Sequence, residues 1–157
     1  MTSGTLQQRF AALQAKAEKE KEEHVARLHQ LHADKATVRL EPPAFSRQSI
    51  SDAGGLLYIE VLLDTERIGL VRVADVGAEL ELSDIQVDPA LHKKGYGTQV
   101  LGTIERIARD IGFSAIVGTV TDLEGDNVDE LISWYTHRGY DVRKRSDNPD
   151  WAIRKPL

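Results

Sequence analysis

The stretch from Ile85 to Ile107 constrains the fold of this chain most, because a strand-like ending, a basic loop with two glycines and an amphipathic helix follow one another in it. Gly95 and Gly97 have no Cβ, so the backbone there can adopt φ > 0 and turn consecutive N–H groups toward an anion. The two lysines before Gly95 add positive charge. From Thr98 onward, apolar residues recur every three or four positions, which predicts a helix whose positive N-terminus faces that anion. The stretch therefore predicts a phosphate-binding loop.

The spacing of the glycines excludes two better-known phosphate loops. A Walker loop has a glycine separated by four residues from Gly-Lys-Ser/Thr, and the dinucleotide fingerprint has a third glycine three residues after its second. Here Gly97 is followed by Thr98, position 100 is Val100, and the next glycine is Gly102. A glycine pair alone is also compatible with an ordinary turn from a loop into a helix, so the surrounding elements have to decide.

Composition limits the function classes open to a chain of 157 residues. With 41% apolar residues it can bury one sizeable core, which predicts a single domain with an appendage. The formal net charge of -5 argues against nucleic-acid binding, which draws on an excess of Lys and Arg, and suits an amine substrate better. The chain has no cysteine, so it can have neither a cysteine nucleophile nor a metal site with cysteine ligands. Because no apolar run approaches the ~18 residues of a membrane span, and no signal peptide is apparent, we expect a cytoplasmic protein without membrane attachment.

Residues 1–35 predict a helical arm, separate from a domain formed by residues 36–157. The stretch from Leu6 to about Lys35 has no proline, and apolar residues stand at helical spacing near its start. Its middle is almost wholly charged. This pattern is compatible with a solvated arm, with a coiled coil between copies, and with a helix that docks on a protein partner. His29 and His32 share a helix face but lack a third ligand at suitable spacing, so we predict no metal site.

The rest of the chain predicts an α+β fold with a mixed, mostly antiparallel central sheet flanked by helices. Glu41 to Gly55 reads as a polar loop, and the segments around the turn at 64–67 predict a hairpin. Gly112 predicts the end of the helix that follows the glycine loop, and the apolar segment after it predicts a buried parallel strand. A shorter helix is expected over 127–139. The expected strands, all of them short, cover residues 36–40, 56–63, 67–74, 79–87, 113–120, 140–144 and 151–154.

Two segments resemble the motifs of the GNAT superfamily of N-acetyltransferases. The run His92-Lys-Lys-Gly-Tyr-Gly97 is similar to the family's coenzyme A loop, Gln/Arg-x-x-Gly-x-Gly/Ala, with histidine at the first position. The run Leu131-Ile-Ser-Trp-Tyr-Thr-His-Arg-Gly-Tyr140 is similar to its aliphatic-x-x-x-Tyr-x-x-x-Gly-Phe/Tyr segment. The order of the expected elements from residue 58 to the end of the chain resembles the family as well. The resemblance implies the GNAT fold and acetyl-CoA as cosubstrate.

The resemblance also implies roles for individual residues. Tyr135 matches the tyrosine that protonates the departing thiolate, although a buried helix aromatic is the simpler interpretation of the same residue. Glu81 matches the carboxylate that takes a proton from the acceptor amine, with Asp84 as the second candidate; Glu79 shares the strand face of Glu81, and both are compatible with plain solvation. Asn127 is one position away from an asparagine that contacts the coenzyme. The remaining implied coenzyme contacts are Ile85, Gln86, Val87, His92, Lys93, Lys94, Gly95, Tyr96, Gly97 and Thr98.

We therefore predict an acetyl-CoA-dependent N-acetyltransferase that moves an acetyl group to a primary amine by direct attack in a ternary complex. A base is needed because an alkylammonium is almost wholly protonated at neutral pH and has no lone pair. The acceptor is expected to be an amine-bearing small molecule or protein. The alternative is a catalytically weak or inactive GNAT-fold interaction module, tethered through its N-terminal helix to a partner or a second copy. His92 at a position where the family has Gln or Arg favours the alternative, whereas Gly95 and Tyr135 favour the enzyme.

Overall fold

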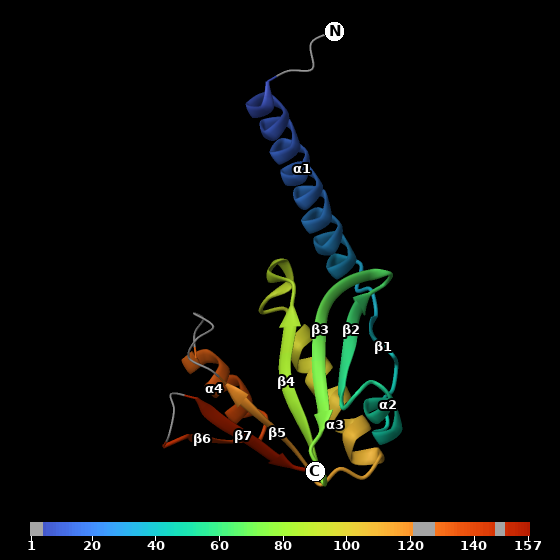
Figure 1. Ribbon diagram of the computed structural model, residues 1–157, viewed down its shortest axis with the longest axis vertical. Helices are drawn as coiled ribbons and strands as arrows, with labels where there is room; N and C mark the ends of the chain where they lie inside the picture. The colour runs from blue at the N-terminus through green and yellow to red at the C-terminus, as the bar shows by residue number, and fades with distance from the viewer. Residues whose placement is uncertain (1–4, 121–127, 147–149) are drawn as a thin grey trace.

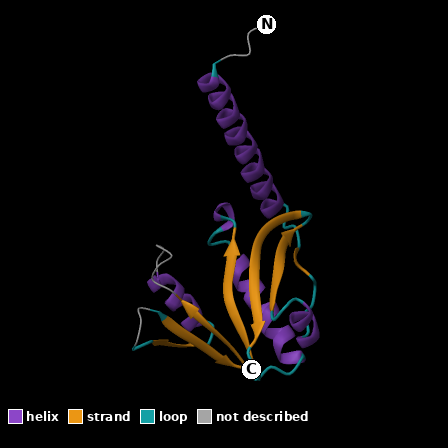
Figure 2. Cartoon of the chain, viewed as in Figure 1, coloured by secondary structure: helices purple, strands orange, loops and turns teal. Residues whose placement is uncertain are grey.

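The computed structural model describes residues 5–120, 128–146 and 150–157. A long helix, α1 (Leu6–Ala33), leads into a sheet that is flanked by shorter helices (Figures 1 and 2). These shorter helices are α2 (Arg47–Asp52), α3 (Tyr96–Asp110) and α4 (Val128–His137), with a 3-10 helix η1 (Pro89–Leu91). The strands in the described ranges are β1 (Val38–Glu41), β2 (Leu56–Leu63), β3 (Glu66–Asp75), β4 (Glu79–Val87), β5 (Ala115–Val120), β6 (Asp141–Lys144) and β7 (Trp151–Pro156). The predicted α+β class is confirmed.

The seven strands form one sheet in the order β1-β2-β3-β4-β5-β7-β6. Only β4 and β5 run parallel, with α3 as the crossover between them, and all other neighbours are antiparallel. The hairpin of β2 and β3 turns at Asp64, whose φ is 56°. The predicted hairpin, the parallel strand after α3, the closing pair of strands and the mixed, mostly antiparallel sheet are thus all confirmed.

The parallel pair stays together over only part of its length. The register of β4 with β5 ends where Leu82 lies opposite Gly118, although β4 continues to Val87. Figure 1 shows the two strands diverging from the end of the sheet that is marked by the C-terminus. The sheet therefore opens like a V between its two halves.

A β-bulge marks the same point in β4. Leu82 and Asp84 lie opposite successive residues of β3, which leaves Ser83 as an extra residue. A bulge of this kind bends its strand and redirects the residues beyond it. The bulge lies where the pairing with β5 ends. It therefore accounts for the bend that takes the end of β4 away from β5.

The core lies between the sheet and α2 and α3, which pack on β2–β3 and on β4–β5 respectively. In Figure 1, α3 passes behind β3 and β4. Leu80 and Leu82 of β4 are buried, and the residues that alternate with them are more exposed. The apolar periodicity of α3 supplies the opposing surface, with Val100, Leu101, Ile104, Ile107 and Ala108 buried. Burial of this stripe fixes how far the N-terminus of α3 extends past the sheet.

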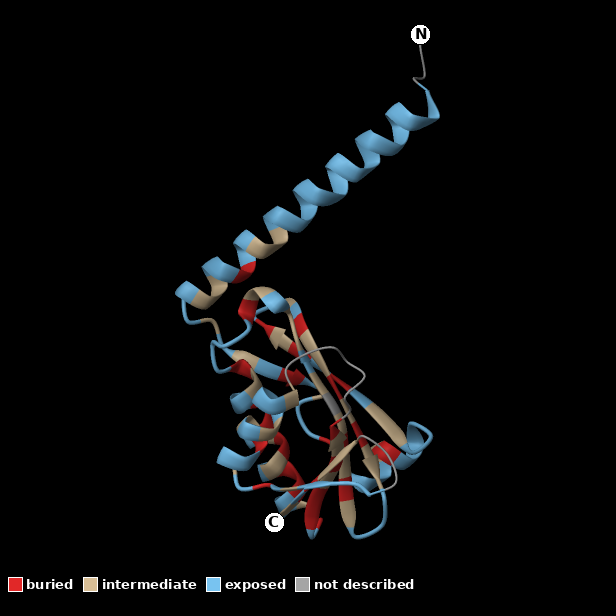
Figure 3. Cartoon of the chain, turned by 90° about the vertical axis from the view of Figure 1, so that its left-hand side faces the viewer, coloured by how far each residue is buried: buried red, intermediate tan, exposed pale blue. Residues whose placement is uncertain are grey.

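The predicted N-terminal helix is present, and only its C-terminal part touches the rest of the chain. Leu28 is fully buried, the Nε of Arg27 donates to Glu66 at 2.7 Å, and the Nε2 of His29 lies 3.2 Å from the Ala90 carbonyl. Figure 3 shows the N-terminal turns as an exposed rod that extends away from the sheet. Among the described residues, no helix has both the length and the hydrophobicity to cross a bilayer.

The start of α3 differs from the prediction. We expected Gly97 to belong to the loop and the helix to begin at Thr98, whereas α3 begins at Tyr96. Gly95, with φ 88°, is the left-handed residue that precedes the helix, and Gly97 is helical. The positive φ directly before the helix is supplied by Gly95, so the conformational freedom of Gly97 is not required.

The predicted polar loop between the first two strands contains α2. Ser46 and Ser49 form a reciprocal capping box at its start, in which the Ser46 hydroxyl accepts from the Ser49 N–H at 3.1 Å. Ile50 is fully buried and anchors the helix to the sheet. Ile50 is the single apolar side chain of α2, which is too weak a periodic signal to predict a helix in a polar, proline-containing stretch.

Alanine substitutions at Gly118 and Gly102 should change the free energy of unfolding in opposite directions. A Cβ at Gly118 would lie 2.6 Å from the Leu82 carbonyl oxygen, so Gly118→Ala should push β5 away from β4 and lower the unfolding free energy by about 1–3 kcal/mol. Gly102 lies inside α3 with open space around it, so Gly102→Ala should raise the unfolding free energy by about 0.5–1 kcal/mol. Urea denaturation followed by circular dichroism measures both. Equal shifts in the same direction would contradict the close approach of β4 and β5 at Gly118.

Candidate functional site

The open edge of β4 forms one side of the candidate site. Ile85, Gln86 and Val87 are paired with β3, and they lie beyond Leu82, where the register of β4 with β5 ends. A strand edge of this kind can pair with the amide groups of an extended ligand as it would with another strand. The three residues therefore lie where a ligand in the V would run along backbone rather than side chains.

The N-terminus of α3 forms the end of this site. Lys93 and Gly95 both adopt left-handed conformations, with φ values of 62° and 88°. The first hydrogen bond of the helix runs from the Gln99 N–H to the Gly95 carbonyl, and no side chain caps the start. The N–H groups of Tyr96, Gly97 and Thr98 therefore have no acceptor inside the helix, and the helix dipole favours an anion in front of them.

The His92 side chain connects the loop to the end of β4 by a hydrogen bond. Its Nε2 lies 2.7 Å from the Val87 carbonyl oxygen, which can only accept, so Nε2 carries the proton of this hydrogen bond. In a neutral ring the other nitrogen is then an acceptor, which does not attract an anion. The ring thus uses its donor within the protein and positions the loop.

The Tyr96 side chain points away from the loop, toward α1. It is buried, its hydroxyl lies 2.7 Å from His32 Nδ1, and the two rings meet edge-on at 5.5 Å. Burial raises the pKa of the Tyr96 phenol, so the hydroxyl keeps its proton at neutral pH. Tyr96 can therefore offer the site only its backbone N–H, while its side chain ties the start of α3 to the N-terminal helix.

A second tie connects the start of α3 to α4. Thr98 Oγ1 accepts from Trp134 Nε1 at 3.2 Å and from Arg138 Nη2 at 2.7 Å. The Arg138 guanidinium also stacks over the Trp134 ring, 4.7 Å from its centroid, and donates from Nη1 to the Trp134 carbonyl at 3.0 Å. These bonds fix a positive charge beside the free N–H groups of the helix.

Tyr135 lies on the inner side of α4. It is buried between two aromatic rings, with Trp134 at 4.8 Å and Tyr140 at 5.3 Å between centroids. This packing fits the simple expectation of a buried helix aromatic, and it also holds the phenol in one orientation in surroundings of low polarity. A fixed orientation is one requirement of a general acid, which has to lie within hydrogen-bond reach of the group that takes its proton.

Glu79 and Glu81, equivalent in the sequence, differ in the structure. Glu79 pairs with Arg154 of β7, with Oε2 3.0 Å from Nε. Glu81 is half-buried, and its Oε1 lies 3.4 Å from the Ser83 hydroxyl at the bulge. Of the two carboxylates, Glu81 is thus nearer to the point where the sheet opens. Two further predicted residues cannot be placed in the site: the Asp84 side chain and all of Asn127 lie outside the described residues.

The basic residues near the C-terminus have partners inside the chain. Lys155 Nζ lies 2.9 Å from the Glu105 carboxylate of α3, which also accepts from the Tyr140 hydroxyl at 3.0 Å. Burial, followed by the neighbouring Glu105 charge, raises the pKa of Tyr140. Three arginines are similarly engaged: Arg143 with Asp141, Arg145 with Thr119 and Arg154 with Glu79. In the described part of the chain, no group of three or more metal-ligating side chains gathers.

Sequence reasoning missed two side chains that position the loop. Arg138 stands at a variable position of the second motif, and its spacing from Tyr135 carries no signal of a contact with α3. His32 was considered only as a metal ligand with His29, whereas it contacts Tyr96 from a distant part of the sequence. Both contacts follow from tertiary packing, which local periodicity does not report.

The comparisons with solved structures show the fold. One similar structure is the PaiA N-acetyltransferase from Thermoplasma acidophilum in complex with coenzyme A, at 20% identity and a TM-score of 0.59, covering 71% of this chain and 67% of that one. A GNAT family acetyltransferase from Elizabethkingia anophelis with acetyl-CoA bound has 16% identity and a TM-score of 0.56, with 71% and 84% covered. The ribosomal-protein-S18-alanine N-acetyltransferase from Escherichia coli has 18% identity and a TM-score of 0.53, with 72% and 77% covered.

The sequence comparison shows the family. No curated protein matches the chain. The model of the acetyltransferase (GNAT) family matches residues 25–140, which include the end of α1, the bulged strand, the glycine loop and α4. The GNAT fold expected from the two motifs is confirmed, and the chain belongs to the acetyltransferase (GNAT) family.

Proposed function

We propose that this protein is an acetyl-CoA-dependent N-acetyltransferase that transfers an acetyl group to a primary amine by direct attack in a ternary complex. The observation that carries the proposal is the uncapped N-terminus of α3 at the end of the open β4 edge. Together they offer an anion site and a row of backbone groups, which suits a long ligand with phosphates at one end and amides along its length.

The residues of the site fit coenzyme A. Its pyrophosphate would be held by the N–H groups of Tyr96, Gly97 and Thr98, with the charges of Arg138 and of the two loop lysines nearby. Space at the turn supports this assignment, because a Cβ built on Gly95 meets nothing within 4 Å. Its pantetheine arm would pair with the backbone of residues 85–87, where the Val87 carbonyl already accepts from His92. When bound, acetyl-CoA supplies the acetyl group as a reactive thioester.

The chain's own side chains would handle two protons. Glu81 would accept a proton from the acceptor ammonium, directly or through water, which frees the nitrogen lone pair. Tyr135 would donate its phenolic proton to the departing sulfur, which leaves more readily as a thiol. The attacking nitrogen would lose its second proton as the amide forms, and that proton would restore the Tyr135 phenol, so the net release is the one proton held by Glu81. No covalent bond to the enzyme is needed.

We propose an amine-bearing small molecule or protein as the acceptor. The net charge of -5 suits a cationic acceptor, because an acidic protein attracts ammonium groups over a distance. Glu81 is on the alternate face of β4 from buried Leu80 and Leu82, so an acceptor would approach from the side of the sheet opposite α3.

The rival function is an interaction module with weak or no catalysis. Two observations favour it. His92 donates its hydrogen bond to the Val87 carbonyl rather than to a ligand, and large apolar side chains are exposed on α1. A protein that binds acetyl-CoA but transfers no acetyl group to any amine in a broad panel would support the rival.

Coenzyme binding should depend on one end of α3 and not on the other. Gly95→Glu should weaken acetyl-CoA binding by at least about 10-fold in isothermal titration, because it adds a side chain and a negative charge in front of the free N–H groups. Gly112→Glu is the matched control, because Gly112 also has positive φ, at 96°, and open space, at the other end of α3. Equal losses in the two variants would mean that strain rather than the anion site is responsible, and unchanged binding in both would remove the site from the loop.

Substitutions at Glu81 and Tyr135 should lower the catalytic rate without weakening acetyl-CoA binding. Glu81→Gln and Tyr135→Phe should each lower kcat by about 10²–10⁴-fold with nearly unchanged acetyl-CoA affinity, because the first variant loses the proton acceptor, the second loses the proton donor, and both nearly keep the side chain's shape. Glu79→Gln is the control, and it should leave kcat within about 3-fold because Glu79 is paired with Arg154. Thiol release measures all three rates. If Glu79→Gln were as slow as Glu81→Gln, Glu81 would lose its assignment as the base.

A further inference from the structure

The exposed half of α1 carries an apolar stripe that continues a buried surface. Leu6, Phe10 and Leu13 are 82%, 63% and 65% exposed. Phe10 precedes Leu28 by eighteen residues, about five helical turns, and Leu13 precedes Leu31 by the same interval. The stripe therefore lies on the same helix face as two residues that pack on the domain. A face that is buried at one end of a helix and bare at the other indicates a second surface for the bare end.

The stripe cannot reach its own domain. α1 is one continuous helix of 28 residues, about 42 Å long, and Leu28 anchors it near its C-terminal end. Figure 3 shows the N-terminal turns standing clear of the sheet. Among the residues that the structure describes, the domain of the same copy therefore offers no surface to Leu6, Phe10 and Leu13.

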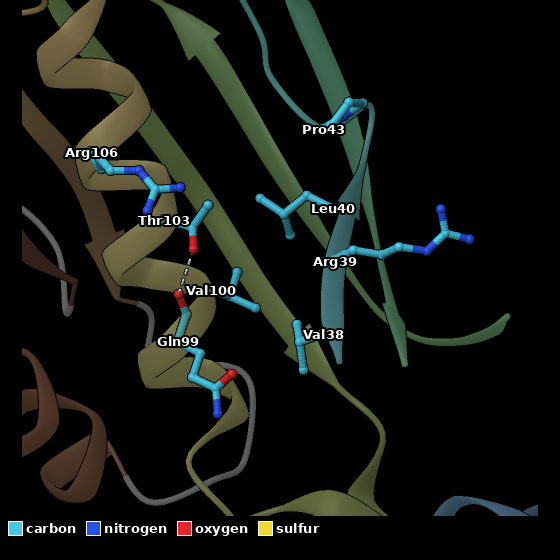
Figure 4. A pocket seen from close by; sticks show the side chains of 8 residues that line it. All are labelled: Val38, Arg39, Leu40, Pro43, Gln99, Val100, Thr103 and Arg106. Carbon is cyan, nitrogen blue, oxygen red and sulfur yellow. Dashed lines mark hydrogen bonds between the residues drawn. The ribbon is translucent and has the colours of Figure 1, made fainter. Parts of the chain in front are cut away.

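The domain carries an open groove beside the point where α1 leaves it. Two hollows of about 250 and 340 Å³ share Val38 and Gln99, so they form one groove between β1 and α3. Figure 4 shows Val38 and Leu40 directed from β1 toward α3, which faces them with Val100 and Thr103. The floor of the groove is therefore apolar. Within the described residues, no further helix or strand covers it.

The charges of the arm and the groove are complementary. Four glutamates and two lysines occupy residues 18–23, about one helical turn beyond the end of the stripe at Leu13. Lys35 and Lys94 line the end of the groove beside α1, and Arg106 lies at the edge of the other hollow. A helix that placed the stripe on the apolar floor could set its acidic segment against these basic side chains.

We propose that two copies of this chain exchange their arms, with the Leu6–Leu13 face of each α1 seated in the β1–α3 groove of the other copy. A two-fold axis makes the contact twice, so one stripe and one groove per chain suffice for a closed dimer. The exchange covers both exposed apolar surfaces at once. The groove shares Lys94 and Tyr96 with the proposed coenzyme loop, but the exchange needs neither coenzyme nor catalysis, so molecular mass and cross-linking test it separately from acetyl transfer.

The exchange predicts a cross-link that one chain cannot make by itself. The protein has no cysteine, so single cysteines can be introduced without background. Leu13→Cys protein mixed with Thr103→Cys protein should form a disulfide-linked heterodimer under mild oxidation. Gly102→Cys replaces Thr103→Cys in the control, because Gly102 is the neighbouring α3 residue, is exposed and does not line the groove. Equal yields with the two α3 positions, or no product, would overturn the groove as the docking site.

Light scattering separates the exchange from other associations. Wild-type protein should have twice the 17.5 kDa of one chain, and both Phe10→Glu and Thr103→Trp should reduce it to one chain. Gln7→Glu, which adds the same charge beside the stripe, should leave the dimer intact. A monomeric wild type would overturn the proposal. A dimer lost in Phe10→Glu but kept in Thr103→Trp, with Leu13→Cys linking to itself, would mean that the arms pair with each other instead.

Discussion

The close pairing of β4 with β5 at Leu82 and Gly118, and its loss directly afterwards, positions the rest of the candidate site. Gly118 permits this approach because a Cβ there would collide with the Leu82 carbonyl. Beyond this point the bulge at Ser83 bends β4, and its backbone continues to Val87 without a strand partner in β5. The same parallel pair also requires a crossover, which is α3. One constraint thus creates both the open edge and the helix N-terminus at its end.

The start of α3 is held from two sides by side chains from distant parts of the chain. His32 of α1 bonds to the Tyr96 hydroxyl, and Arg138 of α4 bonds to Thr98. The backbone N–H groups between these contacts are already held in place before an anion binds. The entropy cost of ordering them therefore arises when the protein folds and does not weaken binding. α1 therefore belongs structurally to the site at its C-terminal end, while its N-terminal end is free for association.

The sequence allowed the prediction of what depends on local chemistry and of what the family motifs imply. Alternation and apolar periodicity located β2, β4 and α3, and the two motifs indicated the GNAT fold, which the family match confirms. The helix α2, the helical state of Gly97 and the contacts of His32 and Arg138 were missed, because each depends on packing between segments far apart in the sequence. The roles of Glu81 and Tyr135 stay predictions, although Glu79 and Glu81 are now distinguished by Arg154.

The central claim is that the β4 edge and the α3 N-terminus together bind acetyl-CoA. Amide chemical shifts in a nitrogen-15 NMR titration with coenzyme A test it at each backbone group. The account predicts the largest changes at residues 85–87 and 95–98, with Gly54 and Gly77, at turns away from the site, unmoved. Saturable changes confined to Val38, Leu40 and Thr103 of the β1–α3 groove, or no saturable change at all, would contradict it.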